Sequence, residues 1–389
     1  MSKESKRTLL VLLGAAHSLN HSLFLVLPLF LLDIVKEFRT SVEIIGLIWG
    51  ASYFIYGAGG IVGGRLSDRF GEVKTITAGL ALSGVSTLIF LVAHNLTVFA
   101  IGLLLMATFA SVYHAIANSF ISKVFQRDMA EAMGIHGTGG NIGYMFAPMI
   151  AVALGTMWGW RVSFLFFGIL SILVSILVLK GSPPPVKETR TEAKIWDVVR
   201  IPELWTLILY NIAIGLFYKG VDFILPTFLK NKDLPPLIMG SALSAILAVG
   251  IFGQWLSGKA SDVWGSKKVL VATSAGTALG LLSLLAVPLP VVGILIFILV
   301  FGFSFYGHQP AFNSLAGLIT PNNLRATVFG VLFFFSFGLG SVSTGIAGVF
   351  ADRYSLESAL YVMTLFSFAA FLFSFLVPAR TERSRKQDK

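Results

Sequence analysis

Cysteine is absent from this chain of 389 residues, and charged side chains are scarce. Without a thiol the chain can form no disulfide, no iron–sulfur cluster and no cysteine nucleophile. Charged residues make up 12% and hydrophobic residues 56% of the sequence, whereas a soluble domain carries about 25% charged residues. This balance excludes an ordinary soluble globule and predicts an integral membrane protein whose solvent is the lipid bilayer.

The sequence also lacks the motifs of common enzyme classes. It has no HExxH metal motif and no nucleophile motif, and the glycine-rich run 137–140 lacks the Lys-Ser/Thr that completes a phosphate loop. We therefore expect no enzyme activity, no cofactor and no metal site. The net charge of +10 would suggest nucleic acid for a soluble protein, but here we attribute it to loops that face anionic lipid and expect no nucleic-acid partner.

Long apolar runs dominate the rest of the chain. A span needs about 20 mainly apolar residues, and the sequence predicts an all-α protein with twelve of them. The predicted spans are 8–32, 42–65, 75–93, 97–122, 131–157, 161–180, 204–229, 237–259, 268–287, 290–318, 325–350 and 356–377. The polar, proline-containing stretch 181–203 predicts a linker between two six-helix bundles, 1–180 and 204–389.

The distribution of basic residues predicts the orientation. With the N-terminus in the cytoplasm, the outer loops hold six of the 29 basic residues, namely Lys36, Arg39, Arg161, Lys230, Lys232 and Arg353. All but one of the others fall on the cytoplasmic side, as the positive-inside rule requires. We expect a monomer in the cell membrane, with both termini and the linker in the cytoplasm.

A short charged element occurs twice, 194 residues apart. Each copy has a glycine, an aspartate four residues later, a second glycine three further on, and a basic end. The first copy contains Gly64, Asp68, Arg69 and Gly71; the second contains Gly258, Asp262 and Gly265. Because the repeat separates two similar runs of spans, it predicts two copies of one membrane unit, an arrangement in which the substrate site lies between the copies.

These residues resemble the loop signature of the major facilitator superfamily, although Glu72 stands where a basic residue is usual. The resemblance implies two pseudosymmetric six-helix bundles that rock around a central cavity, with the charged elements in gating. We expect Gly64, Asp68, Arg69, Gly71 and Asp262 to act as gating residues rather than substrate contacts.

Within that superfamily, the segments 17–20, 112–114 and 137–148 resemble the fosmidomycin-resistance group of drug exporters. The run 137–148 also resembles, in degraded form, an antiporter signature. His21 stands where that group often has Asp, and Ala115-Ile116 replace a common Pro-Glu. The resemblance implies export of small molecules, but two of the carboxylates that could carry protons are missing.

Polar residues inside the predicted spans are the candidate site. Asp222 and Lys219 are the only acidic residue and the only Lys or Arg well inside a span, and their i, i+3 spacing puts them on one helix face. They form either an ion pair that breaks for substrate or proton, or a static pair that holds span 7. His17, Asn20 and His21 share a face of span 1, where His21 is the competing proton carrier.

Spans 4 and 10 carry a second pair of polar groups. They are His114 with Asn118, and His308 with Asn313. Each can line the cavity or make an interhelical hydrogen bond. We expect the nine residues of these four spans to bind substrate or protons.

The leading hypothesis is a secondary active transporter that exports small organic molecules or drugs in exchange for protons by alternating access. The alternative is a proton symporter or facilitator that imports a small organic anion, since the histidines and Lys219 would give its cavity a positive potential. A receptor with a transporter fold is a third possibility, but its mark would be large soluble appendages, and the tails here are short.

Overall fold

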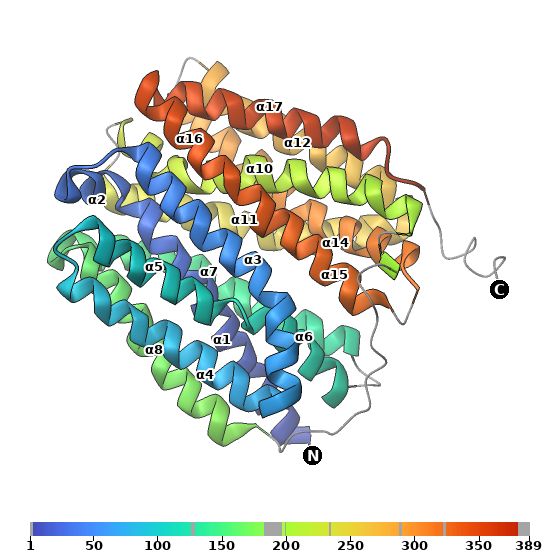
Figure 1. Ribbon diagram of the computed structural model, residues 1–389. Coiled ribbons are helices and arrows are strands. Elements are labelled where there is room, and N and C mark those ends of the chain that lie inside the picture. The colour runs from blue at the N-terminus through green and yellow to red at the C-terminus, as the bar shows by residue number, and fades with distance from the viewer. Residues whose placement is uncertain are drawn as a thin grey trace. The chain divides into compact units, whose positions relative to one another are not determined.

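The computed structural model describes residues 3–125, 129–182, 197–198, 200–232, 235–287, 290–321 and 324–379 (Figure 1). The chain forms two compact units, of which the first comprises 1–189 with 223–244 and the second comprises 190–222 with 245–389. The predicted division at a linker 181–203 stays a prediction, because most of that segment lies outside the described residues.

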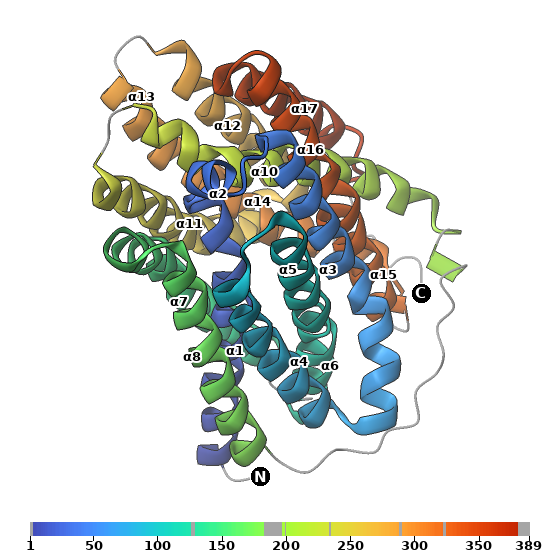
Figure 2. The same ribbon diagram turned by 60° about the vertical axis from the view of Figure 1, so that its left-hand side comes forward.

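Helices make up the described part of the first unit, together with the C-terminal part of α10 and the start of α11. They are α1 (Lys3–Leu29), α2 (Leu31–Phe38), α3 (Val42–Phe70), α4 (Glu72–Ser86), the 3-10 turn η1 (Thr87–Val92), α5 (Leu96–Ala110), α6 (Tyr113–Val124), α7 (Met129–Trp158) and α8 (Trp160–Gly181). The α1 helix packs on α7 and α8, and α4 runs along α8 (Figure 2).

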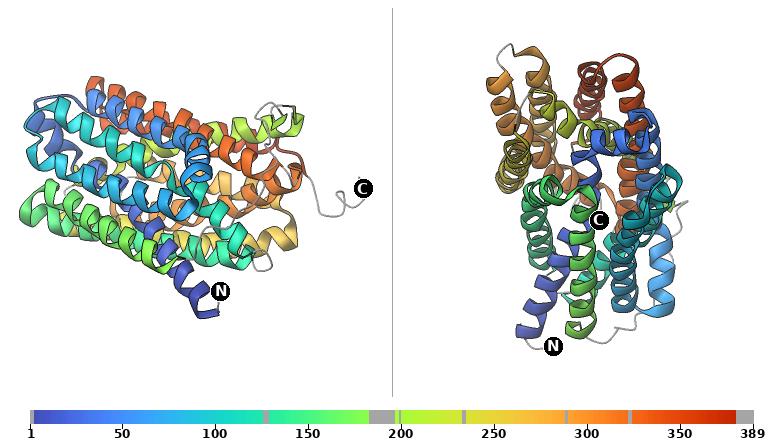
Figure 3. Two further views of the ribbon diagram at one scale, coloured as in Figure 1. Left: turned by 60° about the horizontal axis from the view of Figure 1, so that its bottom comes forward. Right: turned by 90° about the vertical axis from the view of Figure 1, so that its left-hand side faces the viewer.

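The second unit is built in the same way. Its elements are α10 (Pro202–Lys230) and α11 (Pro236–Trp264), each shared with the first unit, then α12 (Ser266–Ala286), α13 (Pro290–Ile296), the π-helix η2 (Phe297–Phe301), α14 (Gly302–Ile319), α15 (Arg325–Phe333), the π-helix η4 (Phe334–Gly338), the 3-10 turn η5 (Leu339–Ser341), α16 (Val342–Arg353) and α17 (Leu356–Ser374). The α12 helix packs on α14 and α17, and Figure 3 shows the long helices from two further sides.

Twelve segments among the described residues are long and apolar enough to cross a membrane, which confirms the prediction of an all-α protein with twelve spans. Their bounds match the predicted ones to within a few residues, for example Leu96–Ile121 for the predicted 97–122 and Pro202–Lys230 for 204–229. The match is close because a run of apolar residues about as long as the bilayer is thick is a strong signal.

The charged elements, which resemble a loop signature in sequence, lie in the last turns of two helices rather than in loops. Helix α3 continues to Phe70 and α11 to Trp264, so Asp68 and Asp262 belong to the last turns of these helices. Only a single glycine then separates each helix from the next one.

Those two glycines explain part of the repeated motif. Gly71 has φ 87° and ψ 149°, and Gly265 has φ 89° and ψ 137°. This region of backbone conformation is open to glycine and disfavoured for residues with a Cβ atom. Both residues donate a backbone hydrogen bond to the serine four residues earlier, at 2.8 and 3.0 Å. The repeat therefore encodes the same sharp reversal in both units.

A polar cluster fixes the other end of the first unit. The Arg161 guanidinium donates hydrogen bonds to the Glu37 carboxylate at 2.5 and 2.9 Å and to the carbonyls of Phe90 and Ala93 at 2.9 and 2.8 Å. The indole of Trp160 donates to Glu37 at 2.8 Å. The bonds from Arg161, with a smaller contribution from Trp160, hold the pKa of Glu37 below its usual value. One carboxylate thus ties α2 to the start of α8.

The glycine turns make a testable prediction. Gly71→Ala and Gly265→Ala should each destabilise the protein by about 1–3 kcal/mol, the cost of a non-glycine residue in such a conformation. Gly134→Ala is the matched control, because Gly134 lies in α7 and an added methyl group there meets nothing within 4 Å. It should be neutral or slightly stabilising. Thermal unfolding in detergent measures all three, and equal unfolding temperatures for Gly71→Ala and Gly134→Ala would contradict the assignment.

Candidate functional site

Four of the six histidines of the chain meet inside the first unit. His17 and His21 come from α1, His114 from α6 and His136 from α7, and we call these four residues the histidine cluster. The Nε2 atoms of His17 and His21 are 3.1 Å apart. The ring of His114 lies 5.0 Å from that of His17 and 4.9 Å from that of His21, measured between centroids. His136 stacks on His17 at 4.6 Å.

Tyrosine rings surround the histidine cluster. Tyr113 stacks beside His17 with centroids 6.0 Å apart, Tyr144 lies 5.4 Å from His21, and Tyr56 lies 5.9 Å from His114. The hydroxyl of Tyr113 donates to the backbone carbonyl of Leu13. The cluster is therefore held in an aromatic shell whose polar ends are tied to neighbouring helices.

Room for the histidine cluster comes from a glycine on α7. A methyl group at Gly140 would overlap the ring of His17. The glycines of the 137–143 run thus act in helix packing, although Gly137 itself faces open space. His136, Gly140 and Gly143 share one helix face, which is the sequence signal that could have placed His136 with the other three histidines.

Asn20 is fully buried and joins three helices. Its amide nitrogen donates to the carbonyl of Ala110 on α5 at 2.9 Å, and its carbonyl oxygen accepts from the hydroxyl of Tyr56 on α3 at 2.5 Å. Both hydrogen bonds of the Asn20 side chain are made within the protein. We therefore assign Asn20 to positioning the neighbouring helices.

In the second unit, Lys219 and Asp222 lie one turn apart on α10 and interact electrostatically. Lys219 is 2% exposed, and its Nζ atom lies 4.1 Å from the ring centroid of Phe337 and 4.7 Å from that of Tyr218. Phe337 belongs to the π-helix η4, a type of irregularity frequent at functional sites. Aromatic faces attract an ammonium group, so Lys219 has partners of two kinds.

The remaining candidates are His308, the two asparagines and the gating residues. The Nδ1–H of His308 is directed to the carbonyl of Phe305 in its own helix, and the His308 ring is buried. Asn118 on α6 and Asn313 on α14 are exposed on the surface of their units. Among the gating candidates, Arg69 and Asp262 are exposed, and the exposure of Gly64 and the side chain of Asp68 lie outside the described part of the structure.

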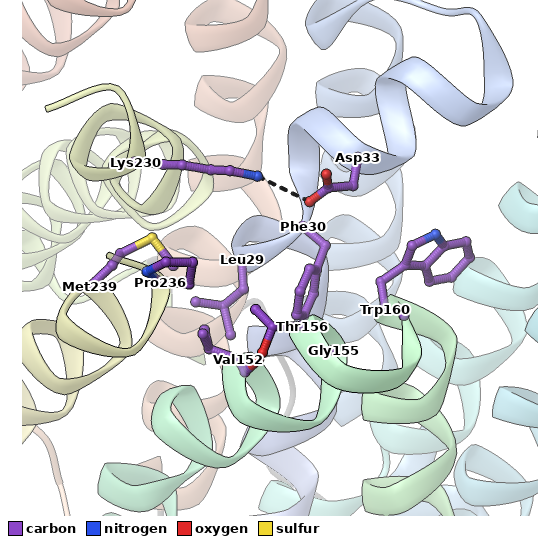
Figure 4. A pocket seen from close by; sticks show the side chains of 11 residues that line it. Leu29, Phe30, Asp33, Val152, Gly155, Thr156, Trp160, Lys230, Pro236 and Met239 are labelled. Carbon is purple, nitrogen blue, oxygen red and sulfur yellow. Dashed lines mark hydrogen bonds and ion pairs between the residues drawn. The ribbon is translucent and has the colours of Figure 1, made fainter. Parts of the chain in front are cut away.

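A cavity in the first unit is lined by residues other than those of the histidine cluster (Figure 4). Its volume is about 370 Å³, and its walls include Phe30, Val152, Trp160 and Met239. Of its lining residues only Asp33 and Lys230 are charged, and their side chains form an ion pair at 3.2 Å. Because both are nearly half exposed, this ion pair is weak. Neither the cavity nor this ion pair was predicted from the sequence.

The family model of the Major Facilitator Superfamily matches residues 10–344. The chain belongs to the Major Facilitator Superfamily. It is therefore a multi-pass membrane transporter and not an enzyme, which confirms the family predicted from the repeated charged elements. Like other members, it sits in a lipid bilayer and carries a small-molecule substrate.

Individual relatives cover most of the chain at low identity. The MFS-type transporter YcxA of Bacillus subtilis is 25% identical over 74% of both chains. The multidrug efflux pump Tap of Mycolicibacterium fortuitum is 27% identical over 58% of both, and the sialic acid transporter NanX of Escherichia coli is 22% identical over 88% of this chain and 87% of its own. These relatives include transporters that are named for different substrates.

A solved structure shares the fold. The bacterial homolog of the human lysosomal transporter Spinster, in an inward-facing and unoccupied conformation, superposes with a TM-score of 0.83. The superposition covers 97% of this chain and 98% of that chain at 17% identity. The prediction of a major facilitator fold is thereby confirmed.

Cysteine accessibility tests where the water-lined surface lies. The chain is naturally free of cysteine, so each introduced thiol is unique. Asn118→Cys and Asn313→Cys should react with a charged, water-soluble thiol reagent, because both positions are exposed and polar. Lys219→Cys should react slowly, because the position is buried.

Leu173→Cys is the control for exposure to lipid. Leu173 is 51% exposed within the apolar span Trp160–Gly181, and a thiol there is not ionised in hydrocarbon. Labelling of membranes, followed by mass measurement, compares the rates. Labelling of Asn118→Cys and Asn313→Cys that is no faster than that of Leu173→Cys would contradict a water-lined surface at these two positions.

Proposed function

We propose that this transporter exports small organic molecules in exchange for protons by alternating access. The single observation that carries the proposal is the Lys219–Asp222 pair, which places a carboxylate and an ammonium inside the span Pro202–Lys230. A charged side chain at the centre of a bilayer costs about 3 kcal/mol or more unless it has a partner or faces water. A pair at this depth therefore indicates a role in transport.

The pair can act as a proton switch. While Lys219 is close, Asp222 stays ionised. When a conformational change or a bound substrate draws Lys219 away, a carboxylate in apolar surroundings favours its neutral form and takes up a proton. The Nζ atom of Lys219 already lies 4.7 Å from the ring of Tyr218 and 4.1 Å from that of Phe337, and these rings would still attract the ammonium once Asp222 was neutral.

Export is supported by two observations. The segments 17–20, 112–114 and 137–148 resemble the fosmidomycin-resistance exporters, and the relatives Tap and the multidrug resistance protein D of Escherichia coli are named for drug efflux or resistance. Import of an organic anion is the second candidate. It is favoured by the likeness to NanX over 88% of the chain and by the basic side chain of Lys219.

The two glycine turns suggest how the gates are built. We assign gating to the last turns of α3 and α11 with their turns at Gly71 and Gly265, because the same reversal recurs in both units. On the opposite face, the Asp33–Lys230 ion pair joins α2 to the end of α10 and would open with that side. The excess of basic residues on one side supports cytoplasmic termini, and we propose that the transporter acts as a monomer.

Neutralising Asp222 tests the proton switch. Asp222→Asn in proteoliposomes should reduce transport driven by an imposed pH gradient to the level of protein-free liposomes, while substrate exchange without a gradient persists. Glu203→Gln is the matched control, because Glu203 lies in the first turn of the same helix. Gradient-driven transport at the wild-type rate in Asp222→Asn would refute the role of this carboxylate.

A folding control separates the switch from simple loss of structure. Asn at position 222 leaves Lys219 without its carboxylate, and breaking a buried pair costs about 3–5 kcal/mol. The double variant Lys219→Met with Asp222→Asn should therefore unfold at a higher temperature than Asp222→Asn alone. The double variant also lacks the carboxylate, so loss of gradient-driven transport in this more stable protein can be assigned to the proton site rather than to unfolding, whereas wild-type stability of Asp222→Asn would contradict a buried pair.

A further inference from the structure

Two imidazoles of the histidine cluster already have the separation of metal ligands. His17 and His21 are four residues apart on α1, the spacing by which two histidines on one helix face bind zinc. Two nitrogen ligands of a tetrahedral zinc ion, each about 2.0–2.1 Å from the metal, lie roughly 3.4 Å from one another. The Nε2 atoms of His17 and His21 are 3.1 Å apart.

A third imidazole completes the set. One ring nitrogen from each of His17, His21 and His114 can be chosen so that all three lie within 4.8 Å of one another. His114 approaches the other two rings almost equally, at 5.0 and 4.9 Å between centroids, so a shared ion would lie between the three rings. Among the described residues this is the only group of three metal-ligating side chains with that proximity.

His136 supplies an independent sign that a ligand belongs here. Its ring is 3% exposed, stacks on His17 at 4.6 Å, and its Nδ1 atom is buried without a hydrogen-bond partner among the described residues. Buried polar atoms are rarely left unsatisfied. A water molecule or anion bound to a metal beside His17 would give this nitrogen a partner, as outer-shell groups do in metal sites.

The donor set decides which ion fits. Imidazole nitrogen suits zinc, copper, nickel and cobalt, whereas magnesium and calcium prefer oxygen ligands. Three neutral imidazoles leave the charge of a divalent ion uncompensated, and the described metal-ligating group contains no carboxylate. The open coordination position therefore favours an anionic donor such as hydroxide or a carboxylate.

We propose that His17, His21 and His114 bind a divalent transition-metal ion, of the zinc, cobalt or nickel class, whose open position takes an anionic ligand. This revises the sequence-based expectation of no metal site, which rested on the absence of an HExxH motif. The site lies in the first unit, whereas Lys219 and Asp222 lie in the second. Metal binding can thus be tested without measuring transport.

The test is equilibrium binding to the purified full-length transporter in detergent, after dialysis against a chelator. The affinity tag must contain no histidine, because a polyhistidine tag binds the same metals. Co²⁺ is the probe for visible absorption, and Zn²⁺ competes for the same site. We expect one Co²⁺ per chain at micromolar concentration, with the intense visible bands of a tetrahedral nitrogen site, and displacement by Zn²⁺.

Matched variants assign the ligands. His21→Gln and His114→Gln should each weaken Co²⁺ binding at least about tenfold, an effect that even outer-shell partners reach. His94→Gln and His308→Gln should leave binding unchanged, because these two histidines lie outside the histidine cluster. Metal should also raise the unfolding temperature of the wild type and not of the cluster variants. The unfolding transition of each variant without metal shows whether that variant is folded.

Two results would overturn the site. One is the absence of saturable Co²⁺ or Zn²⁺ binding by the wild type at micromolar metal. The other is wild-type affinity in folded His21→Gln and His114→Gln. Binding that is lost in His94→Gln or His308→Gln would likewise place the metal elsewhere.

Discussion

A polar group inside a bilayer-spanning helix must find its partners within the protein unless it faces a water-filled cavity. The structure satisfies this constraint in different ways. The side-chain amide of Asn20 donates to the carbonyl of Ala110 and accepts from the hydroxyl of Tyr56, and so ties three helices together. Lys219 lies against Asp222 and two aromatic rings. Asn20 is held by both of its hydrogen bonds, whereas Lys219 interacts with a carboxylate that can be neutralised and with two aromatic rings that cannot.

The same constraint gives the two units of this superfamily transporter different chemistry. The first unit gathers four imidazoles in a tyrosine shell, and the second holds one lysine and one aspartate. Imidazoles offer lone pairs, which suit a metal or an acidic ligand, whereas the ion pair offers a separable charge. In the proposed transporter the proton site and the metal site are therefore separate, and each can be removed by substitution without removing the other.

Most of the fold could be predicted from the sequence, because length and hydrophobicity alone define a span and a repeated glycine–aspartate element defines two similar units. The pairing of Lys219 with Asp222 was also predictable, since residues three apart share a helix face. The meeting of His114 and His136 with His17 was not, because the contact depends on how α6 and α7 pack against α1. Nor was the partner of Lys219 on η4, because a π-helix has no clear signal in the sequence. The helical position of Asp68 and Asp262 was missed because helices extend past the end of the apolar run.

Transport under an imposed pH gradient tests the proposed function most directly. Purified protein in liposomes would be offered a panel of small organic cations, anions and neutral drugs, with the pH gradient in either direction or absent. We predict that at least one compound accumulates against its own gradient, opposite in direction to the proton flow, and that a protonophore abolishes this accumulation. Movement of the same rate and extent with and without the pH gradient would contradict proton coupling, and accumulation in the direction of the proton flow would contradict exchange.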